Sequence, residues 1–238
     1  MKNDIGEDIP DKLYKYMPWP TNGTNYARDL IKNKQIHLQL PAKFNDPFEC
    51  KMLFKDENGQ NDNEIYKLIS HEMNLLHREH TLVTCLTNSP DNILMWSHYA
   101  AEHTGICMEF KMLTNDIIKV DYEKEYPIYE FAANNIYATE ELSQEQCVKF
   151  GKISMARKEI SWKYEQEYRY IIPDKNNMTN DDYFIPLKDF AEITEIICGC
   201  RMEEEEIVNI RKFLAEQGLD IPVKCAKEKE DEYGFDII

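Results

Sequence analysis

The feature that most constrains the fold is a short aromatic helix that runs through one glycine into a strand, within residues 92–110 (NILMWSHYAAEHTGICMEF). Residues 89–91 (Ser-Pro-Asp) precede it, and such residues supply the capping oxygens and the fixed backbone angle with which helices begin. We therefore expect a helix that begins near Asn92 and that Gly105 ends. A strand at Ile106 to Met112 should follow.

The polar aromatic side chains of this helix admit two interpretations. At helical spacing Trp96, Tyr99 and His103 share one stripe, whereas His98 lies on another face. Buried indole, phenol and imidazole groups each need a hydrogen-bond partner, so a helix that served only the core would more simply carry leucines. They are either core side chains with satisfied polar tips or the wall of a pocket, and as a group they favour the pocket.

The remaining elements follow from hydrophobic periodicity and turn signals. Further strands are expected at Leu13 to Met17, Ile36 to Leu40, Thr81 to Thr87, Ile117 to Tyr122, Tyr168 to Ile172, Tyr183 to Leu187 and Ile193 to Cys198, with an edge strand from Ile221. Further helices are expected at Asn25 to Lys34, Asp62 to Arg78, Glu140 to Trp162 and Met202 to Gln217. The apolar stripe of the second of these is expected at Ile65, Leu68, Ile69, Met73 and Leu76.

This succession predicts a single mixed α+β domain over residues 1–238, with antiparallel-rich sheets flanked by helices. Its core should span about residues 13–222, and residues 227–238 should form a charged tail.

Charge and composition narrow the classes of partner. Lys and Arg total 28 against 44 Asp and Glu, a net charge of −16, which makes binding to a phosphate backbone unfavourable. We therefore expect no nucleic acid partner, whereas a protein or a small molecule stays open. No apolar run approaches the roughly 20 residues that span a bilayer, and the first residues lack a signal-peptide core, so we expect a cytoplasmic protein without a membrane partner. Seven cysteines without regular spacing do not form a disulfide framework.

A turn-forming segment at residues 41–50 (PAKFNDPFEC) is a candidate ligand loop. Phe44 and Phe48 would anchor it, and Asn45 and Asp46 at its tip would face a ligand. The alternative is an ordinary turn in which these polar side chains bond nearby backbone groups.

A row of charges marks the stretch at residues 162–172 (WKYEQEYRYII). In a strand, Glu165, Glu167 and Arg169 project to one face, with neighbours about 7 Å apart. This row is either a solvated face of weak ion pairs or a functional site in which Glu167 grips a ligand or acts in catalysis while Arg169 preserves its charge.

Other chemistries have weaker signals. His77 and His80 lack a third ligand at recognisable spacing, and the Cys198-Gly-Cys200 motif lacks a partner pair, so we expect no metal site. There is no phosphate-binding glycine loop, no Gly-x-Ser-x-Gly elbow and no kinase motif set. A cysteine–histidine nucleophile pair stays open, with His98 or His103 and Cys85 or Cys107 as its candidates.

Four motifs in order resemble the bacterial family catalogued as domain of unknown function 2971: LYKY, FNDPFEC, LMWSHYAAEHTGICMEF and WKYEQEYRYII. The resemblance extends from about Leu13 to Gly199. It implies an intracellular protein of the kind found in mobile-element or phage-defence neighbourhoods.

A second resemblance is topological. The order of strand, helix, strand and a late strand opened by Glu167 is similar to the layout of ADP-ribosyltransferases. That resemblance implies that nicotinamide adenine dinucleotide (NAD) lies between two small sheets while Glu167 orients the reacting ribose. Lys15 or Tyr16 would hold the nucleotide where that family usually carries His or Arg. Phe44 and Tyr99 are the candidates for its stacking tyrosine.

Taken together, these signals lead to two hypotheses. The first is an NAD-using enzyme of a bacterial defence or toxin system, which transfers or hydrolyses ADP-ribose with NAD as substrate and no resident cofactor. Glu167 and His98 are its candidate catalytic residues, and the candidate ligand-binding residues are Lys15, Tyr16, Phe44, Asn45, Asp46, Trp96, Tyr99, His103, Glu165 and Arg169. The alternative is a non-catalytic sensor or antitoxin-like module that binds a ligand or a protein through the same cleft.

Overall fold

The computed structural model describes residues 2–3, 6–19, 26–56, 58–60, 64–130, 154–174 and 183–238. Most of the helix predicted at 140–162 lies outside these residues.

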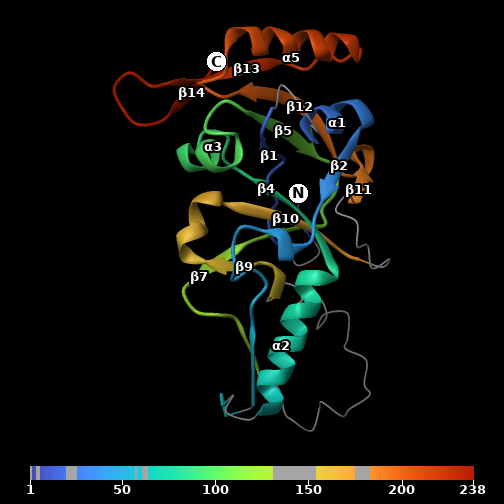
Figure 1. The fold of residues 1–238 in the computed structure, drawn as a ribbon, viewed down its shortest axis with the longest axis vertical. Helices are drawn as coiled ribbons and strands as arrows, with labels where there is room; N and C mark the ends of the chain where they lie inside the picture. The colour runs from blue at the N-terminus through green and yellow to red at the C-terminus, as the bar shows by residue number, and fades with distance from the viewer. Residues whose placement is uncertain are drawn as a thin grey trace.

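The main sheet of the described chain has eight strands in the order β14-β13-β12-β5-β1-β4-β10-β6 (Figure 1). Neighbours are antiparallel except β12 and β13, which are parallel. The strands of this sheet are β1 (Lys12–Met17), β4 (Thr81–Thr87), β5 (Ile106–Met112), β6 (Ile117–Lys119), β10 (Glu167–Pro173), β12 (Ala191–Cys198), β13 (Val223–Glu228) and β14 (Phe235–Ile237).

The sheet is nearly divided between β1 and β4. Strand β1 pairs with β5 along its whole length, and β4 pairs with β10 in the same way, but β1 and β4 share only the residue pair Tyr14 and Thr87. Thr87 also lies opposite Glu167, so these three side chains share one face of the sheet. Because successive side chains alternate, Tyr16 and Arg169 belong to the same face.

Helices lie toward both ends of the molecule and beside the upper strands of the sheet (Figure 1). They are α1 (Tyr26–Asn33), α2 (Glu64–Glu79), α3 (Ile93–Tyr99) and α5 (Glu204–Glu216). Helix α5 lies across the top of Figure 1 and α2 occupies the lower half. The largest apolar core joins strands of both sheet halves to α1 and α5, through buried residues such as Leu13, Leu86, Phe110, Leu30 and Leu214.

Short elements complete the fold. Pairs form between β11 (Tyr183–Pro186) and β2 (Gln35–Leu38), between β3 (Leu53–Lys55) and β8 (Ile128–Glu130), and between β7 (Asp121–Glu123) and β9 (Arg157–Glu159). The 3-10 helices are η1 (Pro41–Lys43), η3 (Ile160–Glu165) and η4 (Leu187–Asp189).

The prediction of a single mixed α+β domain is confirmed, and two strands begin and end at the predicted residues, Thr81–Thr87 and Ile106–Met112. Four local predictions are wrong. The described end of the segment predicted as helix to Trp162 forms β9 and then η3. Residues 227–238 are not a free tail, since β13 extends to Glu228 and β14 closes the sheet edge.

The third error concerns α2. Its buried residues are Tyr66 and Ser70, and the Ser70 hydroxyl accepts a hydrogen bond from the backbone N–H of Phe54. By contrast, Leu68 and Leu76 of the predicted apolar stripe are 60% and 47% exposed. The periodicity located the helix, and Ile69 and Met73 of the predicted stripe do pack against the cluster of Met52, Phe54 and Tyr66, but the rest of the stripe faces outward.

The fourth error is the end of α3, which stops at Tyr99 rather than at Gly105. Ala101, Glu102 and His103 all have positive φ angles, between 47° and 72°, which the helix cannot accommodate. The main chain then packs so tightly against Gly199 that a Cβ there would lie 2.1 Å from the His103 carbonyl oxygen.

Within the described chain, no helix combines the length and apolar character required to cross a bilayer.

Candidate functional site

A pocket of about 370 Å³ opens on the face of the sheet where β1 and β4 diverge. We call it the central pocket. Its walls come from β1, β4, the segment after β2, α3, β9 and the junction of η3 with β10. Its lining residues are Tyr14, Lys15, Tyr16, Gln39, Lys43, Phe44, Asn45, Cys85, Leu86, Thr87, Met95, His98, Tyr99, Lys158, Glu165 and Glu167.

A fully buried guanidinium lies behind this pocket. All five N–H groups of Arg169 have acceptors: two carboxylate oxygens of Glu167 at 2.8 and 3.0 Å, two of Glu49 at 2.6 and 3.1 Å, and the Met155 carbonyl oxygen at 2.7 Å. Both carboxylates are held by two N–H bonds each, a geometry that arginine provides and lysine does not. Glu167 is therefore fixed in place at the pocket wall.

A second cation extends this network toward the pocket. Lys158 donates to Glu165 and, at 3.4 Å, to Glu167, and all three side chains are buried. The Tyr99 hydroxyl donates to the other carboxylate oxygen of Glu165. The network thus links α3, β9, η3 and β10 at one place. It contains three carboxylates, those of Glu49, Glu165 and Glu167, and two cations, Arg169 and Lys158.

The two carboxylates at the pocket wall have opposite pKa shifts. Burial raises the pKa of Glu165, and the Lys158 ammonium opposes this only in part. Burial acts on Glu167 in the same direction, but the charges of Arg169 and Lys158 outweigh it and lower the pKa of Glu167. One carboxylate is therefore kept ionised while its neighbour binds a proton more readily, an arrangement that separates acid–base roles in enzyme sites.

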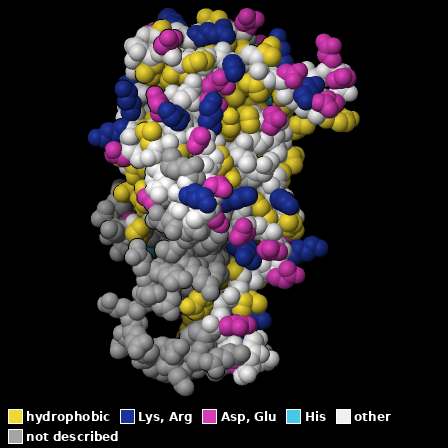
Figure 2. All heavy atoms as spheres, turned by 180° about the vertical axis from the view of Figure 1, so that it is seen from behind, with side chains coloured by type: hydrophobic (Ala, Val, Ile, Leu, Met, Phe, Trp, Pro, Cys, Tyr) yellow, Lys and Arg dark blue, Asp and Glu magenta, His cyan; other side chains and the backbone are white. Residues whose placement is uncertain are grey.

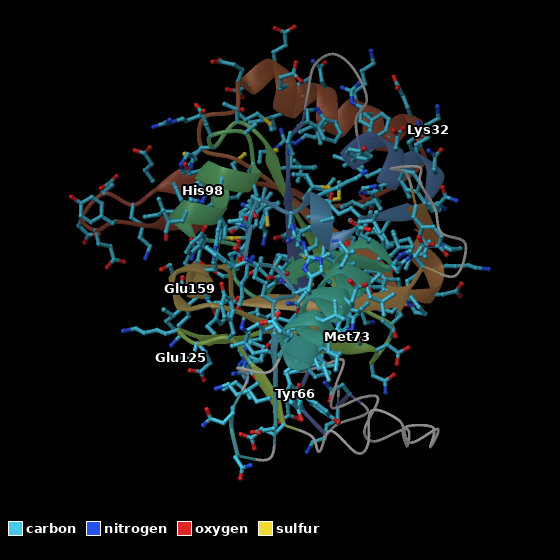
Figure 3. The ribbon with its side chains drawn as sticks, turned by 60° about the horizontal axis from the view of Figure 1, so that its bottom comes forward. Lys32, Tyr66, Met73, His98, Glu125 and Glu159 are labelled. Carbon is cyan, nitrogen blue, oxygen red and sulfur yellow. The ribbon has the colours of Figure 1, made fainter. Side chains whose placement is uncertain are left out.

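Helix α3 contributes the opposite wall. The Asn92 side chain caps it by accepting from the N–H groups of Leu94 and Met95. The side-chain amide of Asn92 also donates to the Tyr164 carbonyl oxygen, and this bond joins the start of α3 to η3. His98 bonds through Nδ1 to the Tyr164 hydroxyl at 3.0 Å. Figure 3 shows His98 on α3 directly above the segment that carries Glu159.

Loop and strand residues close the remaining sides. Asn45 donates to the Tyr99 hydroxyl at 3.1 Å, and the Phe44 ring lies 5.8 Å from the Arg169 guanidinium. Lys15 donates to the Thr84 hydroxyl and the Cys85 carbonyl oxygen, in the gap between β1 and β4. Seven predicted site residues therefore line one pocket with Glu167: Lys15, Tyr16, Phe44, Asn45, His98, Tyr99 and Glu165.

Four predicted site residues do not line this pocket. Asp46 is buried, and its carboxylate accepts from the Phe48 N–H as in an ordinary turn. Trp96 is fully buried and donates to the Pro90 carbonyl oxygen at 3.0 Å, as in the core interpretation. Arg169 lies behind the wall, as described above.

The fourth of these residues, His103, lines a different hollow. That hollow, of about 860 Å³, lies against the β13–β14 hairpin beside Arg201 and Cys200. The hairpin projects from the body with acidic and basic side chains at its tip (Figure 2). Although this hollow is larger, the described residues that line it form no buried ion network, so we place the candidate site in the central pocket.

The cysteine–histidine alternative has an unfavourable environment. Cys85 lines the central pocket and Cys107 is fully buried, and burial raises the pKa of both thiols. Neither cysteine is therefore a ready thiolate nucleophile. In the described part of the chain, no group of three or more His, Cys, Asp or Glu residues could hold a metal ion.

Sequence reasoning missed three members of the site. Glu49 lies within the predicted ligand loop, but nothing in the local pattern indicates an arginine partner 120 residues away. Lys158 lies in a segment predicted as helix. Tyr164 precedes the charge row, and its contact with His98 joins residues 66 positions apart, which no local pattern indicates.

Fold and site together define a single α+β domain whose main sheet opens into a pocket walled by buried carboxylates. Residues 95–170 match the model of a family described as a protein of unknown function, DUF2971. The chain therefore resembles that family over the segment that runs from α3 into β10. This segment supplies His98, Tyr99, Lys158, Glu165 and Glu167. Neither the curated proteins nor the solved structures include a match to the chain.

Proposed function

We propose that the central pocket binds NAD and that the protein breaks the bond between nicotinamide and ribose, transferring ADP-ribose to an acceptor or to water. One observation carries the proposal: the buried network has one carboxylate more than it has cations, and Glu165 and Glu167 both line the pocket. Buried carboxylates at a pocket wall favour a cationic nicotinamide ring and the positive charge that develops on the ribose, and Lys158, the lysine of this wall that contacts them, is paired with both.

The reaction assigns a role to each carboxylate. The bond between the anomeric carbon and the ring nitrogen breaks, its electron pair neutralises the nicotinamide, and positive charge develops at the carbon. The ionised Glu167 stabilises that charge, as carboxylates do in glycoside hydrolysis. An oxygen of water or of an acceptor hydroxyl then bonds to the carbon and releases a proton. Glu165, whose pKa is raised, accepts that proton.

The other walls suit the rest of the ligand. The Tyr99 and Phe44 rings offer faces for stacking, and His98 and Lys43, which also line the pocket, offer donors for hydroxyl or phosphate oxygens. A volume of about 370 Å³ falls in the range of small-ligand pockets and fits the nicotinamide ribose. As its biological setting we propose a bacterial defence or toxin system, in which NAD consumption would arrest the host.

A non-catalytic binding module is the second candidate. It is favoured by the complete pairing of the Arg169 N–H groups, which gives a rigid wall that binds without reacting. Such a module would bind the nucleotide and return it unchanged.

Turnover of NAD separates the two candidates. Purified protein is incubated with NAD, and released nicotinamide is measured by liquid chromatography. We expect release by the wild type and a loss of at least about 100-fold in Glu167→Gln, because one general electrostatic or acid–base group commonly contributes that much. Glu165→Gln should also be slow, whereas Glu192→Gln, which removes an exposed charge on β12, should match the wild type.

Thermal melting establishes that each variant is folded. NAD binding without release would favour the module over the enzyme. If NAD neither binds nor reacts, both forms of the NAD proposal fail.

A further inference from the structure

The central pocket continues past Lys15 into a second hollow of about 290 Å³, which we call the side pocket. Both pockets are lined by Lys15, Gln39 and Cys85. The two therefore meet in the gap where β1 and β4 separate beyond their single paired position. A ligand longer than one nucleotide could extend from one into the other.

The walls of the two pockets differ in charge. The central pocket has Glu165 and Glu167, whereas none of the described residues around the side pocket is a carboxylate. Instead, its lining includes Leu30 and a stacked pair of rings, Tyr26 and His37, whose centroids lie 4.7 Å apart at 23°. An uncharged planar ring fits such a wall, and Tyr26 is 45% exposed, so part of its side chain is accessible for stacking.

Lys15 is placed where the two pockets join. Its ammonium donates to two neutral oxygens, the Thr84 hydroxyl at 3.1 Å and the Cys85 carbonyl at 2.9 Å. Among the described residues, no carboxylate lies within ion-pair distance of it. Burial lowers the pKa of Lys15, and a phosphate beside it would favour the charged ammonium. A cation between two ligand compartments suits the diphosphate that joins the halves of a dinucleotide.

We infer that the side pocket binds the adenosine half of a dinucleotide, stacked against Tyr26, with Lys15 holding the diphosphate. This inference rests on the proposed function, which places the nicotinamide ribose in the central pocket. It specifies the substrate class as a dinucleotide rather than a mononucleotide.

Binding measurements on the full chain test the inference. NAD, nicotinamide mononucleotide and AMP are titrated by calorimetry into the wild type, Tyr26→Leu, Lys15→Met and the control Tyr233→Leu. Tyr233 is fully exposed on the hairpin, so its substitution should change nothing. The wild type should bind NAD about tenfold or more tightly than nicotinamide mononucleotide, since stacking of one base typically contributes that much.

Tyr26→Leu should weaken NAD and AMP binding about tenfold and leave nicotinamide mononucleotide unchanged. Lys15→Met should weaken NAD and AMP binding as well. Should Lys15→Met fail to fold in a melting assay, the Tyr26→Leu comparison decides alone, because Tyr26 is largely at the surface.

The outcomes separate this inference from the proposed function. If NAD reacts but Tyr26→Leu leaves NAD affinity unchanged, the side pocket is not the adenosine site and the proposed function stands. If AMP binds in a Tyr26-dependent way but NAD does not react, the adenosine site is supported and the enzyme proposal fails. If none of the three nucleotides binds, both are overturned.

Discussion

Replacement of Arg169 is the perturbation whose cost the structure defines best. Arg169→Met keeps much of the side-chain volume but leaves the carboxylates of Glu167 and Glu49 buried without their shared cation. Removal of one partner from a buried ion pair typically costs about 3–5 kcal/mol. For a chain of this length each kcal/mol lowers the melting temperature by about 2–4 °C, so a fall of about 6–20 °C is expected.

The assay is thermal denaturation followed by circular dichroism at neutral pH. The melting temperature of Arg169→Lys should lie between those of the wild type and Arg169→Met, because lysine restores the charge but has three N–H donors in place of five. The control is Arg211→Met on α5, where an exposed arginine makes one long bond of 3.4 Å to a carbonyl oxygen, and it should shift melting by less than about 2 °C. A fall of less than about 3 °C for Arg169→Met would refute the view that this network holds the pocket wall.

Three further predictions concern the pocket and its supports. Tyr99→Phe loses the hydrogen bond to Glu165, so its free energy of unfolding in urea should be about 1–2 kcal/mol lower than that of the wild type. Nicotinamide release should also be slower. If neither quantity changes, the contact between Tyr99 and Glu165 is contradicted. The pKa of Glu167 is lowered in the folded protein, so the unfolded chain binds this proton first as the pH falls below about 4.3. Wild-type stability should therefore drop from about pH 5 down to about pH 2, the folded-state pKa of Glu167, and that drop should be smaller in Glu167→Gln. Equal drops in the two proteins would show that Glu167 does not contribute to the pH dependence. Gly199→Ala brings a Cβ to 2.1 Å from the His103 carbonyl oxygen and should cost at least about 1–3 kcal/mol, measured by the melting temperature; no loss would contradict that packing.

Local signals in the sequence predicted much of the fold. Alternation and apolar runs located most of the paired strands of the main sheet, and the Ser-Pro-Asp turn before Asn92 located the start of α3, although the capping side chain is that of Asn92 itself. The end of α3 could not be predicted, because three consecutive non-glycine residues with positive φ are rare. The edge strand predicted from Ile221 corresponds to β13, but β14 was missed because it has three residues and follows a run of charged side chains. It is stabilised by pairing with β13 at the sheet edge rather than by its composition.

The candidate site was predicted in part. The sequence placed Glu167 and Arg169 on one strand face, and it grouped aromatic residues on α3. It could not separate Tyr99, which reaches the pocket, from Trp96, which is buried in the core, because both lie on the same helix stripe. Glu49 is joined to the network only by tertiary folding, which no local pattern encodes.

A crystal structure of Glu167→Gln grown with NAD would test most directly whether NAD binds in the central pocket, because slow turnover would preserve the bound substrate. We predict electron density for the nicotinamide ribose in the central pocket, within hydrogen-bond distance of Glu165 and against the Tyr99 ring. Density for NAD in the hollow beside the β13–β14 hairpin, or an empty central pocket at saturating NAD, would contradict this.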